Sequence, residues 1–191
     1  RIADEEALSG RIFQYEPIIA FLGGTELTYY SPDLSYSTFS LAFVYATGDE
    51  DSLSCIEGNT EGPSHLFIPV SSQEQRVIFN PNVSNLFYIK AGYTIKPFAT
   101  LGRGILEQLL LILDGTIFFR AVPGKISDPQ GLNPDSDTLY LGTEIDFIIN
   151  FRPFSDLGLS LSTGYVFPNN GPDGAFIEGI RDFEFLGKFE L

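Results

Sequence analysis

The stretch that decides the fold is residues 139–167, which read LYLGTEIDFIINFRPFSDLGLSLSTGYVF. Apolar and polar residues alternate through it with a period of two, interrupted by a short turn at residues 153–156. Alternation over about a dozen residues predicts a long strand with one apolar face. Strands of soluble domains average about 5–6 residues, whereas strands that cross a membrane need about 9–11. The apolar set is Leu139, Leu141, Ile145, Phe147, Ile149 and Phe151 before the turn, and Leu157, Leu159, Leu161, Tyr165 and Phe167 after it.

The same alternation recurs along the chain, between segments rich in turn-forming residues. It predicts further strands at residues 18–30, 34–46, 84–96, 109–122 and 181–191, which makes seven in all. The weakest is 109–122, because its first half is apolar on both faces, and a short helix over 105–113 remains a competing interpretation. Whether residues 1–17 contain another strand stays open.

The connections between these strands alternate in length. Residues 47–83, 123–138 and 168–180 form long loops, while 31–33, 97–108 and 153–156 are shorter. In an up-and-down sheet alternate connections lie at the same end, so all three long loops should gather at one end. Short turns at one end and long loops at the other are typical of outer-membrane barrels.

The predicted fold class is therefore all-β: an antiparallel, up-and-down transmembrane β-barrel, or part of a larger one. Bacterial single-chain barrels have an even number of strands, whereas seven are counted here. We therefore expect residues 1–191 to be a single β-barrel domain from the C-terminal part of a larger barrel.

Composition excludes several classes of protein. The formal net charge is −14, from 25 acidic and 11 basic residues, which does not suit a nucleic-acid partner. A stretch of about 18 apolar residues, needed for a transmembrane helix, does not occur. The single cysteine, Cys55, excludes an internal disulfide. The 18 Phe and 9 Tyr suit aromatic girdles at two membrane interfaces, although Trp is absent.

Alternation also divides the residues between two environments. The apolar face is expected to contact lipid, and the polar face is expected to line a lumen, where charged residues set permeation preference. The lipid-facing candidates are Phe39, Leu41, Phe43, Ile145, Phe147, Ile149, Leu159 and Phe189. The pore-lining candidates are Glu26, Lys90, Asp114, Arg120, Glu144, Asp146, Arg152, Glu184 and Lys188.

Signals for catalysis and metal binding are weak. His65 is the only histidine, and nothing places a nucleophile beside it with a third residue to orient it, so an enzyme is not expected. The acidic run Asp49, Glu50 and Asp51 offers carboxylate oxygens that suit Ca²⁺. It does not match a twelve-residue calcium loop, and a solvated loop is the simpler interpretation. No motif indicates a cofactor.

Three segments suggest a family. The segment LGTEIDFIINFRPFSDLGLSLSTGYVFP resembles the penultimate hairpin of alginate-export-like outer-membrane porins. FVYATGDED resembles that family's strand-to-loop junction, and NVSNLFYIKAGYTIKP resembles the strand that returns from the loop. The resemblance covers residues 34–191 in outline and implies an outer-membrane barrel of sixteen or eighteen strands when complete. It implies that Glu144, Asp146 and Arg152 belong to a polar transport lining. The acidic chain does not suit an anionic polymer, so alginate is not implied as the substrate.

The function expected from these patterns is that of a porin or ion channel for passive transport of small or polar solutes across the outer membrane of a Gram-negative envelope. The expected partners are outer-membrane lipid and the solutes themselves, and the long loops are candidates for contact with an envelope protein. Acidic loops predict a modest preference for cations. Two alternatives stay open: a structural or partner-binding barrel that transports nothing, and a soluble β-sandwich that serves as a binding module.

Overall fold

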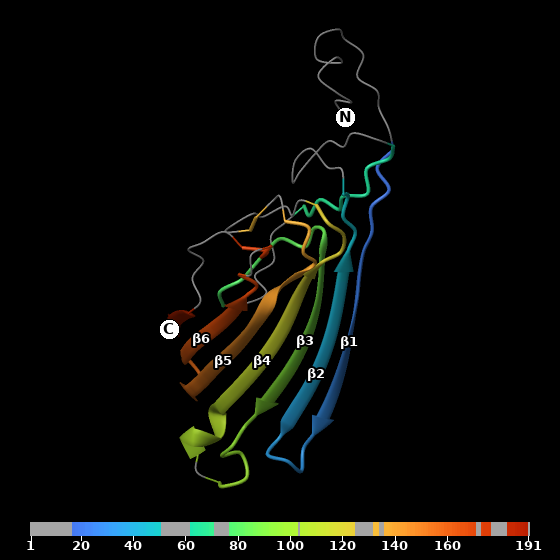
Figure 1. Ribbon diagram of the computed structural model, residues 1–191. Helices are drawn as coiled ribbons and strands as arrows, with labels where there is room; N and C mark the ends of the chain where they lie inside the picture. The colour runs from blue at the N-terminus through green and yellow to red at the C-terminus, as the bar shows by residue number, and fades with distance from the viewer. Residues whose placement is uncertain are drawn as a thin grey trace.

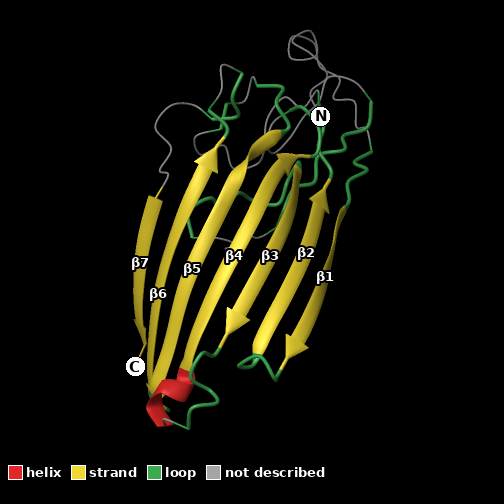
Figure 2. Ribbon diagram, turned by 60° about the horizontal axis from the view of Figure 1, so that its bottom comes forward, coloured by secondary structure: helices red, strands yellow, loops and turns green. Residues whose placement is uncertain are grey.

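The computed structural model describes residues 17–50, 62–70, 77–102, 104–124, 132–133, 136–170, 173–176 and 183–190. Within them the chain forms one antiparallel sheet of seven strands, each paired with its neighbours in sequence (Figures 1 and 2). The strands are β1 (Leu22–Ser31), β2 (Ser37–Ala46), β3 (Leu86–Ile95), β4 (Leu109–Arg120), β5 (Tyr140–Phe154), β6 (Leu157–Pro168) and β7 (Phe183–Glu190). The predicted all-β, up-and-down topology is confirmed. The sheet is open, with β1 and β7 as its edges, and is not closed into a barrel.

The first hairpin is shorter than the sequence pattern predicts. Residues 32–36 form its turn, in which Ser35 and Tyr36 adopt positive φ angles of 50° and 54°. The Ser37 amide then donates to the Leu34 carbonyl at 2.9 Å. Left-handed backbone cannot continue a strand, so β2 begins at residue 37 rather than 34. At the other end β1 begins at residue 22, and Ile18 makes only an isolated parallel bridge with Ser64.

For residues 105–113 the sequence left open a strand or a short helix, and the structure contains a short helical turn followed by a strand. A single 3-10 turn, η1 (Gly104–Gln108), comes first, and the strand starts at Leu109. Gly102 and Gly104 hold φ angles of 57° and 58°, which glycine adopts without steric cost. The expectation of strand for residues 109–113 is therefore confirmed, and the helical competitor is confined to the residues before them.

The hairpin of β5 and β6 has a tighter turn than predicted. β5 continues to Phe154, and only Ser155 and Asp156 lie between it and β6, so the four-residue turn expected at 153–156 is wrong. Arg152 holds this turn: its Nε and Nη2 atoms both donate to the Ser155 carbonyl, at 3.2 Å and 2.6 Å. The cross-strand register shifts between Phe151 and Phe154, which lets the strand run past its proline.

Side chains alternate between the two faces as predicted. Odd-numbered residues pair with odd-numbered ones from strand to strand, for example Ile89 with Ile117 and Ile145 with Tyr165. We call the face that carries the odd-numbered side chains of β1–β6 the apolar face, and the opposite one the polar face. Phe147 is 38% exposed on the first and Glu144 is 1% exposed on the second.

One bulge reverses this rule. Phe118 pairs with Gly142 and Phe119 pairs with Tyr140, which leaves Leu141 as an extra residue in β5. Its side chain is therefore fully buried, among residues of the polar face, while Tyr140 contacts Phe119 on the apolar face. The prediction that Leu141 lies on the apolar face is wrong for this reason.

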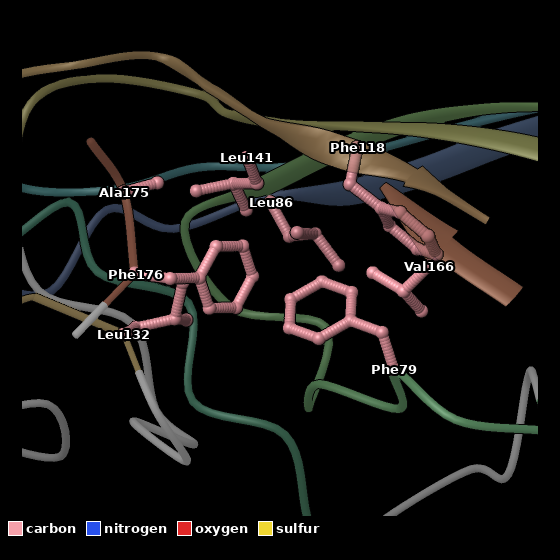
Figure 3. Packing of buried hydrophobic residues seen from close by; sticks show 8 residues of the cluster. All are labelled: Phe79, Leu86, Phe118, Leu132, Leu141, Val166, Ala175 and Phe176. Atoms are coloured by element: carbon pink, nitrogen blue, oxygen red, sulfur yellow. The ribbon is translucent and has the colours of Figure 1, made fainter. Parts of the chain in front are cut away.

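The described parts of the long connections lie together at one end of the sheet, and the short turns and η1 lie at the other (Figures 1 and 2). The described parts of the long connections pack against the polar face and form the buried core there. Figure 3 shows this core, which consists of Phe79, Leu86, Phe118, Leu132, Leu141, Val166, Ala175 and Phe176. The core thus lies between the sheet and its own loops, and not between two sheets.

Candidate functional site

The apolar face is exposed along the whole length of the strands. Phe43 is 41% exposed, Ile145 45% and Leu159 36%, and in the described part of the chain no second sheet covers them. The exposed odd-numbered apolar side chains of this face on β1–β6 are Leu27, Tyr29, Phe39, Leu41, Phe43, Ile89, Leu113, Ile117, Ile145, Phe147, Leu159, Leu161, Tyr165 and Phe167. Tyr140 and Phe154 join them, because register shifts in β5 pair them with Phe119 and Leu157. An apolar surface of this extent is rare on a soluble monomer and marks contact with lipid or protein.

Aromatic rings gather at both ends of this face. The loop-end girdle contains Phe43, Phe87, Phe119, Tyr140, Tyr165 and Phe167. Ring contacts link the first four in a row, at centroid distances of 4.9–5.6 Å, and join the last two as a separate pair at 4.6 Å. The turn-end girdle contains Tyr29, Phe39 and Tyr93, with contacts at 6.4 Å and 4.8 Å. Phe87 and Tyr93 belong to the two girdles and stand six residues apart on β3, about 20 Å along the strand. Mostly aliphatic side chains fill the band between them.

The polar face carries buried charge. Asp114 is 8% exposed and Asp146 is 2% exposed, and the two are direct cross-strand partners on β4 and β5. Lys90 compensates this concentration of charge, because its Nζ lies 2.8 Å from Asp114 Oδ2. In a soluble protein Asp and Lys are mostly exposed, and Phe and Ile are mostly buried. Here the charged side chains are buried on the polar face and the Phe and Ile side chains are exposed on the apolar face.

Glu144 fixes the long connection between β2 and β3 to the polar face. Its Oε1 accepts a hydrogen bond from the Ile78 amide at 2.8 Å, and its Oε2 accepts one from the Phe79 amide at 2.9 Å. A carboxylate that bridges two successive amides holds the backbone in one register. Phe79 then packs edge-on against Phe118 and Phe176, at centroid distances of 4.9 Å and 5.4 Å (Figure 3).

Arg120 does the same for the connection between β4 and β5. It ends β4, is 2% exposed, and donates from Nη1 to the carbonyls of Gly124 and Ser136 and from Nη2 to that of Asn133. Three carbonyls on one guanidinium draw the two ends of this loop together. Neither Arg120 nor Glu144, both predicted to line a pore, has an open environment in the described structure.

The rest of the predicted lining falls into three groups. Lys90, Asp114 and Asp146 lie together at mid-strand. Glu26 is exposed, and Arg152 is exposed at the turn end. Glu184, Lys188 and the lipid-facing candidate Phe189 lie on β7, whose side chains are outside the described structure. Of the other lipid-facing candidates Ile149 is half-buried and the remainder are exposed.

The calcium candidates are only partly described. Asp49 is buried, and its Oδ2 accepts a hydrogen bond from the His65 amide at 2.8 Å. Glu50 is exposed, and Asp51 lies outside the described residues. No cluster of three or more metal-ligating side chains occurs in the part of the chain that the structure describes. His65 itself places Nδ1 2.9 Å from the Ile19 carbonyl.

A hollow of about 420 Å³ opens on the polar face near the short turns. The side chains of Lys96, Gln108, Asn150, Arg152 and Ser160 line it, together with Leu110, Phe151, Gly158 and Leu159. Lys96 continues the even-numbered series of β3, the face that the alternation assigns to the lumen. Loop residue Phe79 was not predicted to have a site role, but one signal was available: Tyr88, Phe118 and Val166 break the polar series at the loop end of their strands.

No protein-family model matches this chain, and no curated protein or solved structure matches it either. None of the described helical residues forms a helix long and apolar enough to span a membrane.

Proposed function

We propose that the sheet is one arc of an outer-membrane β-barrel and that the complete barrel conducts small polar solutes passively. The observation that carries the proposal is the inverted burial: Phe147 and Ile145 are exposed while Glu144 and Asp146 are buried. A lipid-facing apolar band between two aromatic girdles, with charge on the opposite face, is the arrangement of transmembrane barrels. The open edges of β1 and β7 would pair with further strands, because unpaired backbone groups are not tolerated in hydrocarbon.

Strand lengths and loop placement support the same proposal. β1–β6 contain 10–15 residues each, which meets the 9–11 or so that a tilted strand needs to cross the hydrocarbon core. Long loops at one end and short turns at the other match the extracellular and periplasmic ends of such barrels. A soluble β-sandwich would instead place a second sheet on the apolar face.

A barrel that conducts nothing is the second candidate, and a specific observation favours it. Glu144 and Arg120 hold two long connections on the polar face, where Phe79 and Phe176 pack in the core. In a narrow barrel these segments would fill the interior. Strand number decides between the two, because about eight strands leave an interior filled by side chains and sixteen to eighteen leave a channel.

Fluorescence quenching tests the membrane part of the proposal. The chain has no Trp, so Phe147→Trp and Ile148→Trp each give a single reporter on opposite faces of β5. In vesicles with brominated acyl chains, Phe147→Trp should be quenched strongly and Ile148→Trp weakly. Equal quenching would remove the lipid-facing assignment.

Single-channel recording tests the transport part. The complete folded barrel in a planar bilayer should give discrete conductance steps. If it inserts, as the quenching experiment would report, but gives no conductance, the channel is excluded and the non-conducting barrel remains.

A further inference from the structure

The hollow at the turn end of the polar face differs in charge from the rest of that face. Both ionisable side chains that line it, Lys96 and Arg152, are cationic, in a chain with a net charge of −14. The nearest acid on β5 is Asp146, four residues before Asn150, which is about 13 Å along the strand. In β7 the register places Lys188 opposite Ser160 and Glu190 opposite Gly158, one base and one acid.

Lys96 and Arg152 are close enough for both side chains to contact one small anion. Lys96 follows the last residue of β3, and β4 separates it from Asn150 and Arg152 on β5. Neighbouring strands are about 4.8 Å apart, so these positions lie about 10 Å apart, a span that two long side chains bridge through a small ion between them.

The cations differ in how they are held. The Ser155 carbonyl accepts from Nε and Nη2 of Arg152, which fixes its guanidinium plane and leaves Nη1 without a described partner. The Lys96 ammonium has no partner among the described residues. The backbone amide of Lys96 donates to the Ser35 carbonyl at 3.1 Å, which anchors the residue at the end of β3. The fixed guanidinium fork suits two oxygens of one acid group, and the lysine adds a mobile charge.

Neutral donors complete the site. Ser160 Oγ donates to Asn150 Oδ1 at 2.7 Å, and this hydrogen bond fixes the orientation of the Asn150 side-chain amide. Its Nδ2 is then free to donate into the hollow, beside the side chain of Gln108. Two cations and an oriented amide donor in a recess of about 420 Å³ suit an oxyanion on a small molecule.

We infer that this hollow binds the carboxylate or phosphate group of a small acidic solute. The inference deepens the proposed function by naming a class of solute that the polar face recognises at its turn end. The binding itself does not require a bilayer. Loss of conductance with binding retained would therefore remove the channel and keep the site, and loss of binding with conductance retained would do the reverse.

Isothermal titration calorimetry of the detergent-folded protein tests it, at fixed low ionic strength. The probes are succinate and inorganic phosphate, with butane-1,4-diol as the uncharged counterpart of succinate. We expect saturable binding of at least one anion and none of the diol. Binding of succinate alone assigns a carboxylate, and binding of phosphate alone assigns a phosphate.

Variants locate the site. Lys96→Gln should weaken binding about tenfold or more, because it removes a charge-assisted hydrogen bond, and Lys96→Arg should restore most of it. Lys90→Gln is the matched control, because Lys90 lies six residues before Lys96 on β3, about 20 Å along the strand, and pairs with Asp114. It should change binding much less than Lys96→Gln does. Absence of anion binding, equal binding of the diol, or equal affinity in Lys96→Gln and the unmodified protein would each overturn the inference. Arg152→Gln is a weaker test, because Arg152 also holds the Ser155 turn.

Discussion

Asp146 on β5 leans over Gly164 on β6: a Cβ atom built on Gly164 would lie 2.6 Å from Asp146 Oδ1. Its cross-strand partner Asp114 leans the other way, over Gly92 on β3, where a Cβ would lie 2.7 Å from Asp114 Oδ1. Like charges directly opposite each other destabilise a sheet. The two glycines give each carboxylate room to turn away from the other.

Gly164→Ala should therefore destabilise the protein by about 1–3 kcal/mol, the usual cost of overpacking a close-packed site. The new methyl group would also lie 3.2 Å from both Ile78 and Val77. Gly115→Ala is the matched control, because nothing lies within 4 Å of its Cβ position on the apolar face. Urea unfolding of the detergent-folded protein measures both. Equal midpoints for the two variants would contradict the close packing at Gly164.

Glu144→Ala should release the segment around Phe79 from the polar face. It leaves the Ile78 and Phe79 amides without their acceptors, and each buried amide left unpaired costs about 1–3 kcal/mol. The measurement is amide hydrogen exchange, which should become faster at these two residues. Glu26→Ala is the control, since Glu26 is exposed and its only hydrogen bond given by the structure is a long one, from Thr28. Unchanged protection in Glu144→Ala would show that packing of Phe79 alone holds the segment.

Arg substitutions on the apolar face should show a dependence on depth. If the face contacts lipid, Phe147→Arg, near the middle of β5, should reduce stability in a bilayer by about 2–4 kcal/mol. Phe154→Arg, at the turn end of the same strand and 62% exposed, should cost only about 0–1 kcal/mol, because Arg reaches the interface there. Folding equilibria in vesicles measure both. Equal costs would argue against a membrane around this face.

The alternation of apolar and polar residues predicted most of the fold. Odd positions such as Phe147 and even positions such as Glu144 were separated correctly because one strand face is apolar along its whole length. The misplacement of Leu141 has a local cause, a bulge, which inserts one residue without a distinct sequence signal. The bounds of β2 and β5 were missed by a few residues because turn geometry at Tyr36 and Ser155 decides them.

Less of the candidate site was predictable. The strand pattern predicts that Glu144 and Arg120 are charged side chains lining a lumen. In the structure both form hydrogen bonds with backbone groups of distant loops. Such contacts depend on how a long connection folds back, and periodicity carries no information about that. The even-numbered apolar residues Phe118 and Val166 were the available hint, because an apolar side chain on a polar face needs a cover.

Ion preference should follow exposure and not the count of acids, if the barrel conducts. Fixed charges of one sign concentrate the opposite ion in a low-dielectric passage, and exposed charges are screened over about 8–10 Å. Glu26 and Glu50 are exposed, whereas Glu144 already binds two amides and Asp114 is paired with Lys90. We expect a modest cation preference that weakens as salt rises. The double variant Glu26→Gln/Glu50→Gln should reduce it more than Lys90→Gln changes it in either direction. Reversal potentials across a salt gradient measure this, and an anion preference in the unmodified protein would show that Lys96 and Arg152 at the turn end outweigh the acidic loops.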